Sequence, residues 1–349
     1  MGMDQQYNFS LVNAFGTKVT PMQKNQFIRL VLVGLLACLG LATAHHGSAD
    51  NHKWHKIRVG YLPIAAELPL FVAIEGGFFK EAGVEVEIIR LASSNEMGNA
   101  ATADQIDILA GCASNVVFDI GHVSGKRHLL FALNPYSNDK GHVTDHLIVR
   151  KASSVSTLSG LKGKKIASFP GSVNRIFTYL ILEKHGVPRD SYTYMELLPK
   201  DWQPSLQSGA IDAVSALEPN ATQIIKDGVG VSIFPGFYAD LMPDVPLSGH
   251  WVAADFFKRC DKAQLSAFVG AYDKAIMFCR KQEKRAKQYL VKYANVREDI
   301  VTDVNLNPWK RRSEINVQQL QKYIDLLAEH KALQAKGKAT QYLLPVVRK

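Results

Sequence analysis

The chain has 349 residues, of which 47% are hydrophobic and 21% charged, with 25 glycines and 14 prolines. This composition fits one large or two ordinary globular domains and excludes a disordered, collagen-like or coiled-coil protein. Lysine and arginine total 41 against 32 acidic residues, a net charge of +9. Because the basic residues are spread along the chain, we expect no nucleic-acid partner, whereas anionic ligands are compatible with this charge.

Catalytic and metal-binding signatures are missing from the sequence. The four cysteines are too few and too widely spaced for a disulfide scaffold, and the eleven histidines show no metal-ligand spacing. There is no G-x-S-x-G, H-E-x-x-H, P-loop or G-x-G-x-x-G motif. Cys112 follows a predicted strand, where it is either a nucleophile or, as we favour, a small packed residue. We therefore expect no catalytic residues, no metal and no cofactor.

An apolar run at residues 30–44 follows two basic residues and ends in the small-x-small site Ala42-Thr43-Ala44. This layout predicts a signal peptide at residues 1–44 and an extracytoplasmic, periplasmic protein. A membrane anchor is the alternative, but the run is shorter than the roughly 20 residues that span a bilayer. Leu35-Leu36-Ala37-Cys38 also has the form of a lipobox, so a lipid anchor at Cys38 stays open, as does a start at Met22.

The first half of the remaining chain alternates between short apolar strands and amphipathic helices. Such alternation predicts an α/β fold with a parallel sheet covered on both faces. The predicted strands are residues 57–62, 84–91, 106–110 and 129–133, and the predicted helices are residues 68–82, 97–103 and 114–124.

A second alternating set follows an extended stretch at residues 147–149 and a polar connection, and a helical tail begins at residue 262. Pro243 and Pro246 are predicted to interrupt the pattern before a strand at residues 251–253. We therefore assign residues 57–150 and about 247–349 to a first lobe and residues 151–246 to a second. Strands of the second set are predicted at residues 165–169, 193–197, 210–217 and 229–234, and helices at 172–185, 204–208 and 221–227.

In open α/β sheets, ligands bind beyond the carboxyl ends of the strands, where helix N-termini present free N–H groups. Ser114 and Ser172 open helices there, as ligand contacts, ordinary N-caps or both. Glu218 either holds a ligand amine or forms a salt bridge across the lobes, and Trp251 either lines a pocket or packs in the core. The candidate ligand-binding residues are Pro63, Glu67, Ser94, Asn95, Ser114, Asn115, Tyr136, Ser172, Asn174, Glu218 and Trp251.

Several segments together resemble substrate-binding proteins of the nitrate, sulfonate, taurine and thiamine-pyrimidine-precursor type, which serve ABC importers. They are residues 57–61, 73–86 (AIEGGFFKEAGVEV), 158–167 (LSGLKGKKIA), 209–213 (GAIDA) and 217–219 (LEP). The resemblance implies a two-lobed periplasmic-binding-protein fold of the second topological class (type II), here with C-terminal helices, that closes on a ligand and is not an enzyme. It also implies that Ser114, Ser172, Glu218 and the loop at residues 63–67 face the cleft.

Two positions depart from the family pattern. Asp104 stands where such proteins usually have glycine, and Asn220 stands where an aromatic residue is common. The favoured hypothesis is a monomeric binding protein that captures a small polar solute, such as a sulfonate, another anion or an amine-bearing heterocycle, and delivers it to a membrane permease. The alternatives are a periplasmic sensor subunit for a membrane receptor and an enzyme of the pyrimidine-precursor synthase type on the same scaffold.

Overall fold

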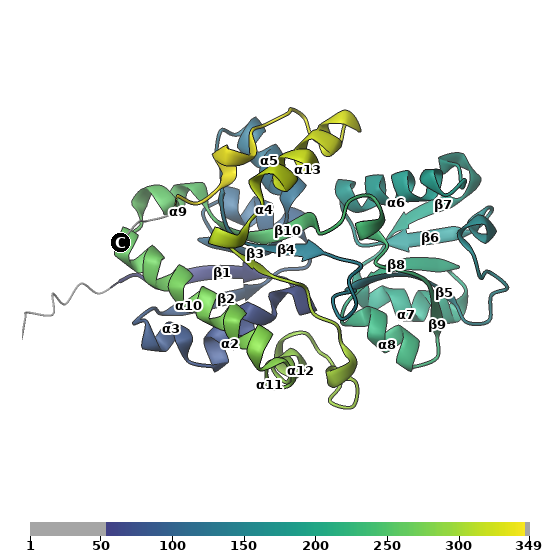
Figure 1. The fold of residues 1–349 in the computed structure, drawn as a ribbon, viewed down its shortest axis with the longest axis horizontal. Coiled ribbons are helices and arrows are strands. Elements are labelled where there is room, and N and C mark those ends of the chain that lie inside the picture. The colour runs from purple at the N-terminus through teal and green to yellow at the C-terminus, as the bar shows by residue number, and fades with distance from the viewer. Residues whose placement is uncertain (1–53, 346–349) are drawn as a thin grey trace, which may run out of the picture. The chain divides into compact units, whose positions relative to one another are not determined.

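The structure is a computed structural model that describes residues 54–345. The predicted signal peptide at residues 1–44, Cys38 and Met22 lie outside the described residues. The described chain forms two β-sheets, each accompanied by helices (Figure 1). We call the group around the first sheet lobe 1 and the group around the second sheet lobe 2. The two-lobed α/β fold predicted from the sequence is confirmed.

Lobe 1 is built on six strands in the order β11-β4-β10-β3-β1-β2. Its core buries aromatic and aliphatic side chains from the sheet and the helices, among them Val59, Phe131 and Phe268. The strands are β1 (Ile57–Tyr61), β2 (Val86–Arg90), β3 (Ile108–Ala113), β4 (Leu129–Tyr136), β10 (Val245–Val252) and β11 (Lys310–Arg311). The helices are α2 (Leu68–Glu75), α3 (Phe78–Glu81), α4 (Ser94–Thr102), α5 (Ser114–Val123), α9 (Ala254–Arg259), α10 (Lys262–Lys281), α11 (Glu283–Lys287), α12 (Tyr289–Tyr293) and α13 (Val317–Glu329).

Lobe 2 has five strands in the order β7-β6-β8-β5-β9. Trp202 and Ile166 are fully buried in its core. The strands are β5 (Asp145–Arg150), β6 (Lys165–Ser168), β7 (Thr193–Glu196), β8 (Ala213–Leu217) and β9 (Gly230–Pro235), and the helices are α6 (Ser172–Lys184), α7 (Pro199–Ser208) and α8 (Asn220–Lys226).

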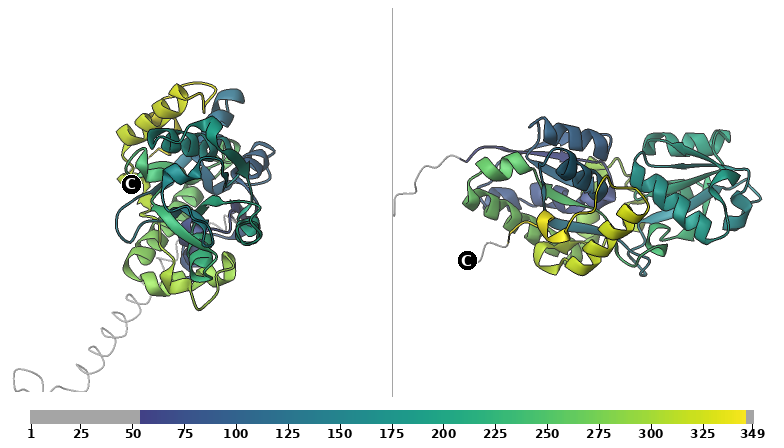
Figure 2. Two further views of the ribbon diagram at one scale, coloured as in Figure 1. Left: turned by 90° about the vertical axis from the view of Figure 1, so that its right-hand side faces the viewer. Right: turned by 90° about the horizontal axis from the view of Figure 1, so that it is seen from above.

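The C-terminal helices belong to lobe 1. In Figure 2 the last long helix, α13, is the yellow helix beside that lobe. Tyr323 of α13 packs against Phe118 of α5, with 6.5 Å between the ring centroids. The described residues at both ends, near 54 and 345, therefore belong to the same lobe, and lobe 2 is an insertion between β4 and β10.

Both sheets are mixed rather than parallel, which corrects the expectation from the sequence. β10 is antiparallel to β3 and β4, and β5 is antiparallel to β8 and β9. β5 and β10 each directly follow a crossover between the lobes. β5 also pairs within the second sheet, although the predicted boundary assigned residues 145–150 to lobe 1.

β10 is much longer than the strand predicted at residues 251–253, and it includes Pro246. Proline cannot donate to a sheet ladder, so it is expected at irregular positions. The pairing of β10 with β4 shifts register between Val245 and Ser248, which accommodates Pro246 inside the strand.

Two helices also differ from their predicted extents. The helix predicted at residues 68–82 is divided into α2 and α3, because Gly77 adopts a left-handed φ of 76°. α7 begins at Pro199 and contains Pro204, whereas a helix was expected only from residue 204. Because proline fits the first turn of a helix, both Pro199 and Pro204 are compatible with a helix start. The sequence pattern predicted a start at Pro204, whereas α7 starts at Pro199.

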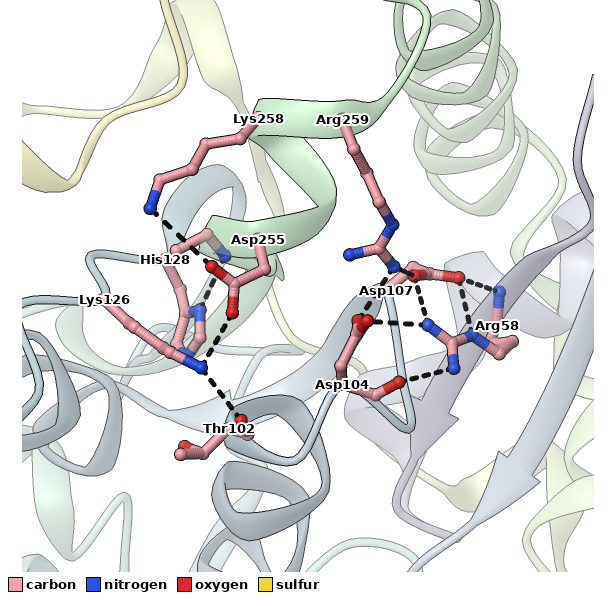
Figure 3. Close-up of polar contacts among 10 residues, drawn as sticks. Arg58, Thr102, Asp104, Asp107, Lys126, His128, Asp255, Lys258 and Arg259 are labelled. Atoms are coloured by element: carbon pink, nitrogen blue, oxygen red, sulfur yellow. Dashed lines mark hydrogen bonds and ion pairs between the residues drawn. The ribbon is translucent and has the colours of Figure 1, made fainter.

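A network of charged side chains joins the start of β1 to the turn before β3 and to α9 (Figure 3). The buried carboxylate of Asp107 accepts hydrogen bonds from the Arg58 backbone N–H at 2.9 Å and from the Arg259 guanidinium at 2.6 Å. Asp104 pairs with the same two arginines, at 3.2 Å from Arg58 and 2.8 Å from Arg259. Its backbone has φ of 56°, a left-handed conformation that explains why glycine suits this position.

This backbone conformation leads to a small but specific prediction. Asp104→Ala should be less stable than Asp104→Gly by about 1 kcal/mol, because a Cβ atom is disfavoured in the left-handed region. Both variants lose the side-chain contacts with Arg58 and Arg259, so their difference in urea denaturation isolates the backbone effect. An alanine variant as stable as the glycine variant would contradict the prediction.

Candidate functional site

A cavity of about 630 Å³ lies between the two lobes, at the carboxyl ends of β1, β2, β6, β7 and β8. This is where the strand-end rule for α/β sheets places a ligand. Lobe 1 contributes Leu62, Pro63, Ile64, Arg90, Leu91, Ala92 and Glu96, lobe 2 contributes Phe169, Leu198, Pro199, Lys200, Gln203, Asn220 and Gln223, and the segment after α12 contributes Ala294 and Asn295.

The cavity wall carries more positive than negative charge. Arg90 and Lys200 are both exposed and, among the described residues, neither forms an ion pair. Glu96 is the one acidic residue in the wall, and its carboxylate accepts a hydrogen bond from the Ala92 N–H at 2.7 Å. Lys200 also lies in the first turn of α7, whose dipole adds positive potential. The wall therefore favours an anionic group.

Neither cation was predicted from the sequence as a site residue. Arg90 is the last residue of β2, and Lys200 lies a few residues beyond the end of β7. A basic side chain at the carboxyl end of a strand is the signal that could have identified both. Of the predicted residues, Pro63 lines the cavity. Asn220, which was not among them, also lines it, so an amide stands where the family commonly has an aromatic residue.

Asn115 and Ser172 are brought together across the lobes. The Asn115 Nδ2 donates a hydrogen bond to the Ser172 Oγ at 2.9 Å, joining the start of α5 to the start of α6. The Asn115 Oδ1 is buried without a hydrogen-bond partner in the described structure. Ser114 and Ser172 are not N-caps, so that alternative is wrong. The N-caps of α5 and α6 are Ala113 and Gly171, and neither forms a side-chain cap bond.

Four other predicted residues lie outside the cavity wall. The Ser114 hydroxyl donates to the Pro246 carbonyl at 2.9 Å, and the Ser94 hydroxyl accepts from the Ala113 N–H at 3.0 Å. Asn95 is exposed outside the cavity wall, and Asn174 is buried in α6.

The aromatic candidates pack in the protein interior. Trp251 is fully buried, meets Phe118 edge-on and donates to the Cys112 carbonyl at 3.3 Å, as the core-packing alternative expected. Tyr136 is also buried, edge-on to Tyr238 of lobe 2 with ring centroids 6.1 Å apart. Cys112 is fully buried and burial raises its thiol pKa, so it is a packed residue and not a reactive one.

Glu67 points into lobe 1 and not into the cavity, contrary to the expectation for its loop. Its carboxyl group is fully buried, with its Oε2 3.6 Å from the Nδ1 of His250. His250 in turn contacts the Tyr272 hydroxyl at 2.9 Å and Asn134 at 2.8 Å. Burial raises the pKa of Glu67 well above its usual range and lowers the pKa of His250 to about 3. His250 is therefore neutral near pH 7, and burial favours the protonated form of Glu67.

Glu218 is occupied by protein donors. Its carboxylate accepts from the Thr222 hydroxyl at 2.7 Å, the Thr222 N–H at 3.1 Å and the Asn305 N–H at 3.4 Å. Burial raises its pKa to about 7, against the opposing effect of these hydrogen bonds. Among the described residues no cation forms a salt bridge with it. Its cross-lobe contacts are hydrogen bonds: the carboxylate accepts from the Asn305 N–H, and the backbone carbonyl accepts from the Ala65 N–H at 3.2 Å.

The part of the chain that the structure describes contains no cluster of three or more side chains suited to hold a metal ion. Over the same residues, no helix has the length and apolar character needed to cross a bilayer.

The fold and the cavity define a two-lobed α/β protein of the second binding-protein topology. The chain matches the NMT1-like family over residues 50–293, more than half of its length, and it belongs to that family. A relative from Bacillus subtilis (strain 168), named as an aliphatic sulfonates-binding protein, is 27% identical over 238 residues, 62% of this chain and 66% of that protein.

Solved structures with the same fold include both binding proteins and an enzyme. The alkanesulfonate-binding protein SsuA from Xanthomonas axonopodis pv. citri, bound to MOPS, is similar with a TM-score of 0.68 at 14% identity, covering 83% of this chain and 98% of that one. The desulfurization enzyme DSZB is similar with a TM-score of 0.60 at 14% identity, covering 83% and 96%. Function must therefore be argued from the site.

Proposed function

We propose that this protein captures a small anionic solute outside the cytoplasm and delivers it to the membrane permease of an ABC importer. The observation that carries the proposal is the cavity between the lobes, with Arg90 on one wall and Lys200 on the other. The predicted signal peptide supports an extracytoplasmic location. The name of the Bacillus relative supports an organic sulfonate as the type of solute.

The walls of the cavity favour an anion over an amine-bearing heterocycle. The wall holds two cations against one carboxylate, Glu96, which already accepts a hydrogen bond from the Ala92 N–H. Capture follows from hinge closure: a solute that contacts both lobes at once gains its full contacts only in the closed form, and so shifts the population toward it.

Catalysis is disfavoured by the same cavity. Among the described residues, neither a histidine nor a cysteine lines it, so its described wall offers no thiol paired with an imidazole base. His250 and Cys112 are both buried inside lobe 1. A monomeric binding protein needs neither.

The proposal predicts that each of the two cations contributes to affinity. In a thermal-shift screen against alkanesulfonates, taurine, nitrate and bicarbonate, a compound at about 100 times its Kd should stabilise the protein by about 2.7 kcal/mol. Arg90→Gln and Lys200→Gln should each weaken binding of that compound by about tenfold or more, or about 1.4 kcal/mol. Calorimetric titration measures the loss.

Lys80→Gln is the matched control, because Lys80 in α3 is also exposed, lies outside the cavity and forms no ion pair with a described residue. It should leave the affinity unchanged. Charge-conserving Arg90→Lys and Lys200→Arg should retain most of the binding. Equal affinities in the wild type and both glutamine variants would remove the two cations from the site.

A further inference from the structure

A segment after α12 is anchored in lobe 1 at both of its ends. We call residues 294–307 the strap. Before it, the ring of Tyr293 stacks on Phe71 of α2, with centroids 4.6 Å apart and planes at 11°. After it, the Trp309 indole N–H donates to the Ala66 carbonyl at 2.8 Å, and β11 pairs with β4. Both ends of the strap are therefore fixed to lobe 1 by these contacts.

The middle of the strap is tied to α8 of lobe 2. Arg297 pairs with Asp227 at 2.7 Å, and Asp303 pairs with Lys226 at 2.7 Å, both at the C-terminal end of α8. At the other end of the helix, the Asn305 N–H donates to the Glu218 carboxylate at 3.4 Å. The strap therefore contacts α8 of lobe 2 at both ends of that helix.

The strap also contacts one of the two chain crossovers between the lobes. The Asn307 amide donates to the Pro135 carbonyl at 3.1 Å and to the Thr144 hydroxyl at 3.2 Å, at either end of the crossover from β4 to β5. The Leu306 carbonyl contacts the His142 ring within that crossover at 2.9 Å. At the start of the strap, Ala294 and Asn295 line the cavity.

We infer that the strap is a clasp that holds α8 against lobe 1, so that its ion pairs set the degree of lobe closure and, through it, the affinity for solute. Only the effect on solute affinity rests on the proposed function; the role of the strap in lobe closure does not. Opening the cleft moves α8 relative to lobe 1, whereas both ends of the strap stay with lobe 1. We therefore expect opening to break the two ion pairs. Arg297 and Lys226 act as positioning residues that do not line the cavity.

The test is a charge swap in the pair between Lys226 and Asp303. Lys226→Glu and Asp303→Lys each place like charges together, and the double variant restores an opposite pair with reversed sign. We expect each single variant to raise the radius of gyration of the solute-free protein in small-angle X-ray scattering, and the double variant to return it to the wild-type value. Arg297→Gln should act in the same direction as the single variants.

Arg175→Glu is the control, because it breaks an ion pair with Glu196 that lies wholly within lobe 2. It should leave the radius of gyration unchanged. All variants are compared by circular dichroism to establish that they are folded. If the folded Lys226 and Asp303 single variants match the wild type in scattering, or if the double variant fails to restore them, the clasp is overturned whatever the protein binds.

The affinity arm uses an alkanesulfonate that stabilises the wild-type protein. The single variants should weaken its binding by about threefold to tenfold, since a smaller closed fraction raises the apparent Kd in proportion. An expanded variant with wild-type affinity would refute the link from closure to binding while leaving the clasp intact. A wild-type protein that binds no solute would count against the proposed function, and the scattering result would still decide the clasp.

Discussion

Replacing Gly111 by alanine is expected to destabilise the protein by about 3 kcal/mol, because two penalties act at one position. Gly111 has φ of 75°, and a Cβ atom there would lie 1.5 Å from the Oε1 of Glu67. The Glu67 carboxyl group is fully buried beside His250, so it has little room to withdraw. Urea denaturation of the two proteins measures the loss.

Gly125→Ala separates the two penalties. Gly125 has φ of 69° but no atom within 4 Å of the added Cβ, so this variant should lose only about 1 kcal/mol, the cost of the backbone conformation. Shortening the carboxylic side chain in Gly111→Ala/Glu67→Ala should remove the clash, so that the two substitutions do not add. Equal losses for the two glycine variants would show that Glu67 does not occupy the space above Gly111.

A second large effect is expected in the pH dependence of stability, through Asp145. This buried carboxylate at the start of β5 accepts a hydrogen bond from the Tyr238 N–H at 2.7 Å, which joins the start of β5 to the segment after β9. Burial raises its pKa to about 7. The folded state therefore binds a proton that the unfolded state, with an ordinary aspartate pKa near 4, does not bind between about pH 4 and 7.

The direction of the pH dependence of stability follows from this difference in bound protons. Asp145 should make the wild type more stable as the pH falls from 8 to 5, on the order of 3 kcal/mol, relative to Asp145→Asn. Buried histidines act in the opposite direction, since burial lowers the pKa of His128 and His146 to about 4. The informative quantity is thus the difference in unfolding free energy between wild type and variant at each pH. A difference that is constant from pH 8 to pH 5 would mean that Asp145 does not titrate in this range.

Elements whose signals are local could be predicted from the sequence. β1 and β6 and the helices α5 and α6 lie close to their expected positions, because each combines an apolar pattern with a clear start or stop. β10 could not be recovered in full, since it contains Pro246 and its partners, β3 and β4, lie more than a hundred residues earlier in the chain. Pairing at such separations leaves no mark on local periodicity.

The candidate site was predicted in location more than in detail. The strand-end rule led to Pro63 and to the Asn115 and Ser172 pair, because it fixes where the backbone lies. It does not fix the direction of a side chain, and Glu67 and Trp251 turn inward from positions close to the cleft. Arg90 and Lys200 meet in one cavity only because two separately folded sheets face each other, which no local pattern encodes.

The place of β10 between β3 and β4 also constrains the order in which the chain can assemble. Lobe 2 uses one continuous stretch, residues 145–235, so all its partners are present once that stretch has been synthesised. Lobe 1 has a gap in its sheet until residues 245–252 arrive, and its edge strand β11 comes later still. During synthesis from the N-terminus, β3 and β4 are made before β10, the strand that pairs with both of them. Lobe 1 therefore has a high contact order, and its sheet is completed in a late, slow folding step.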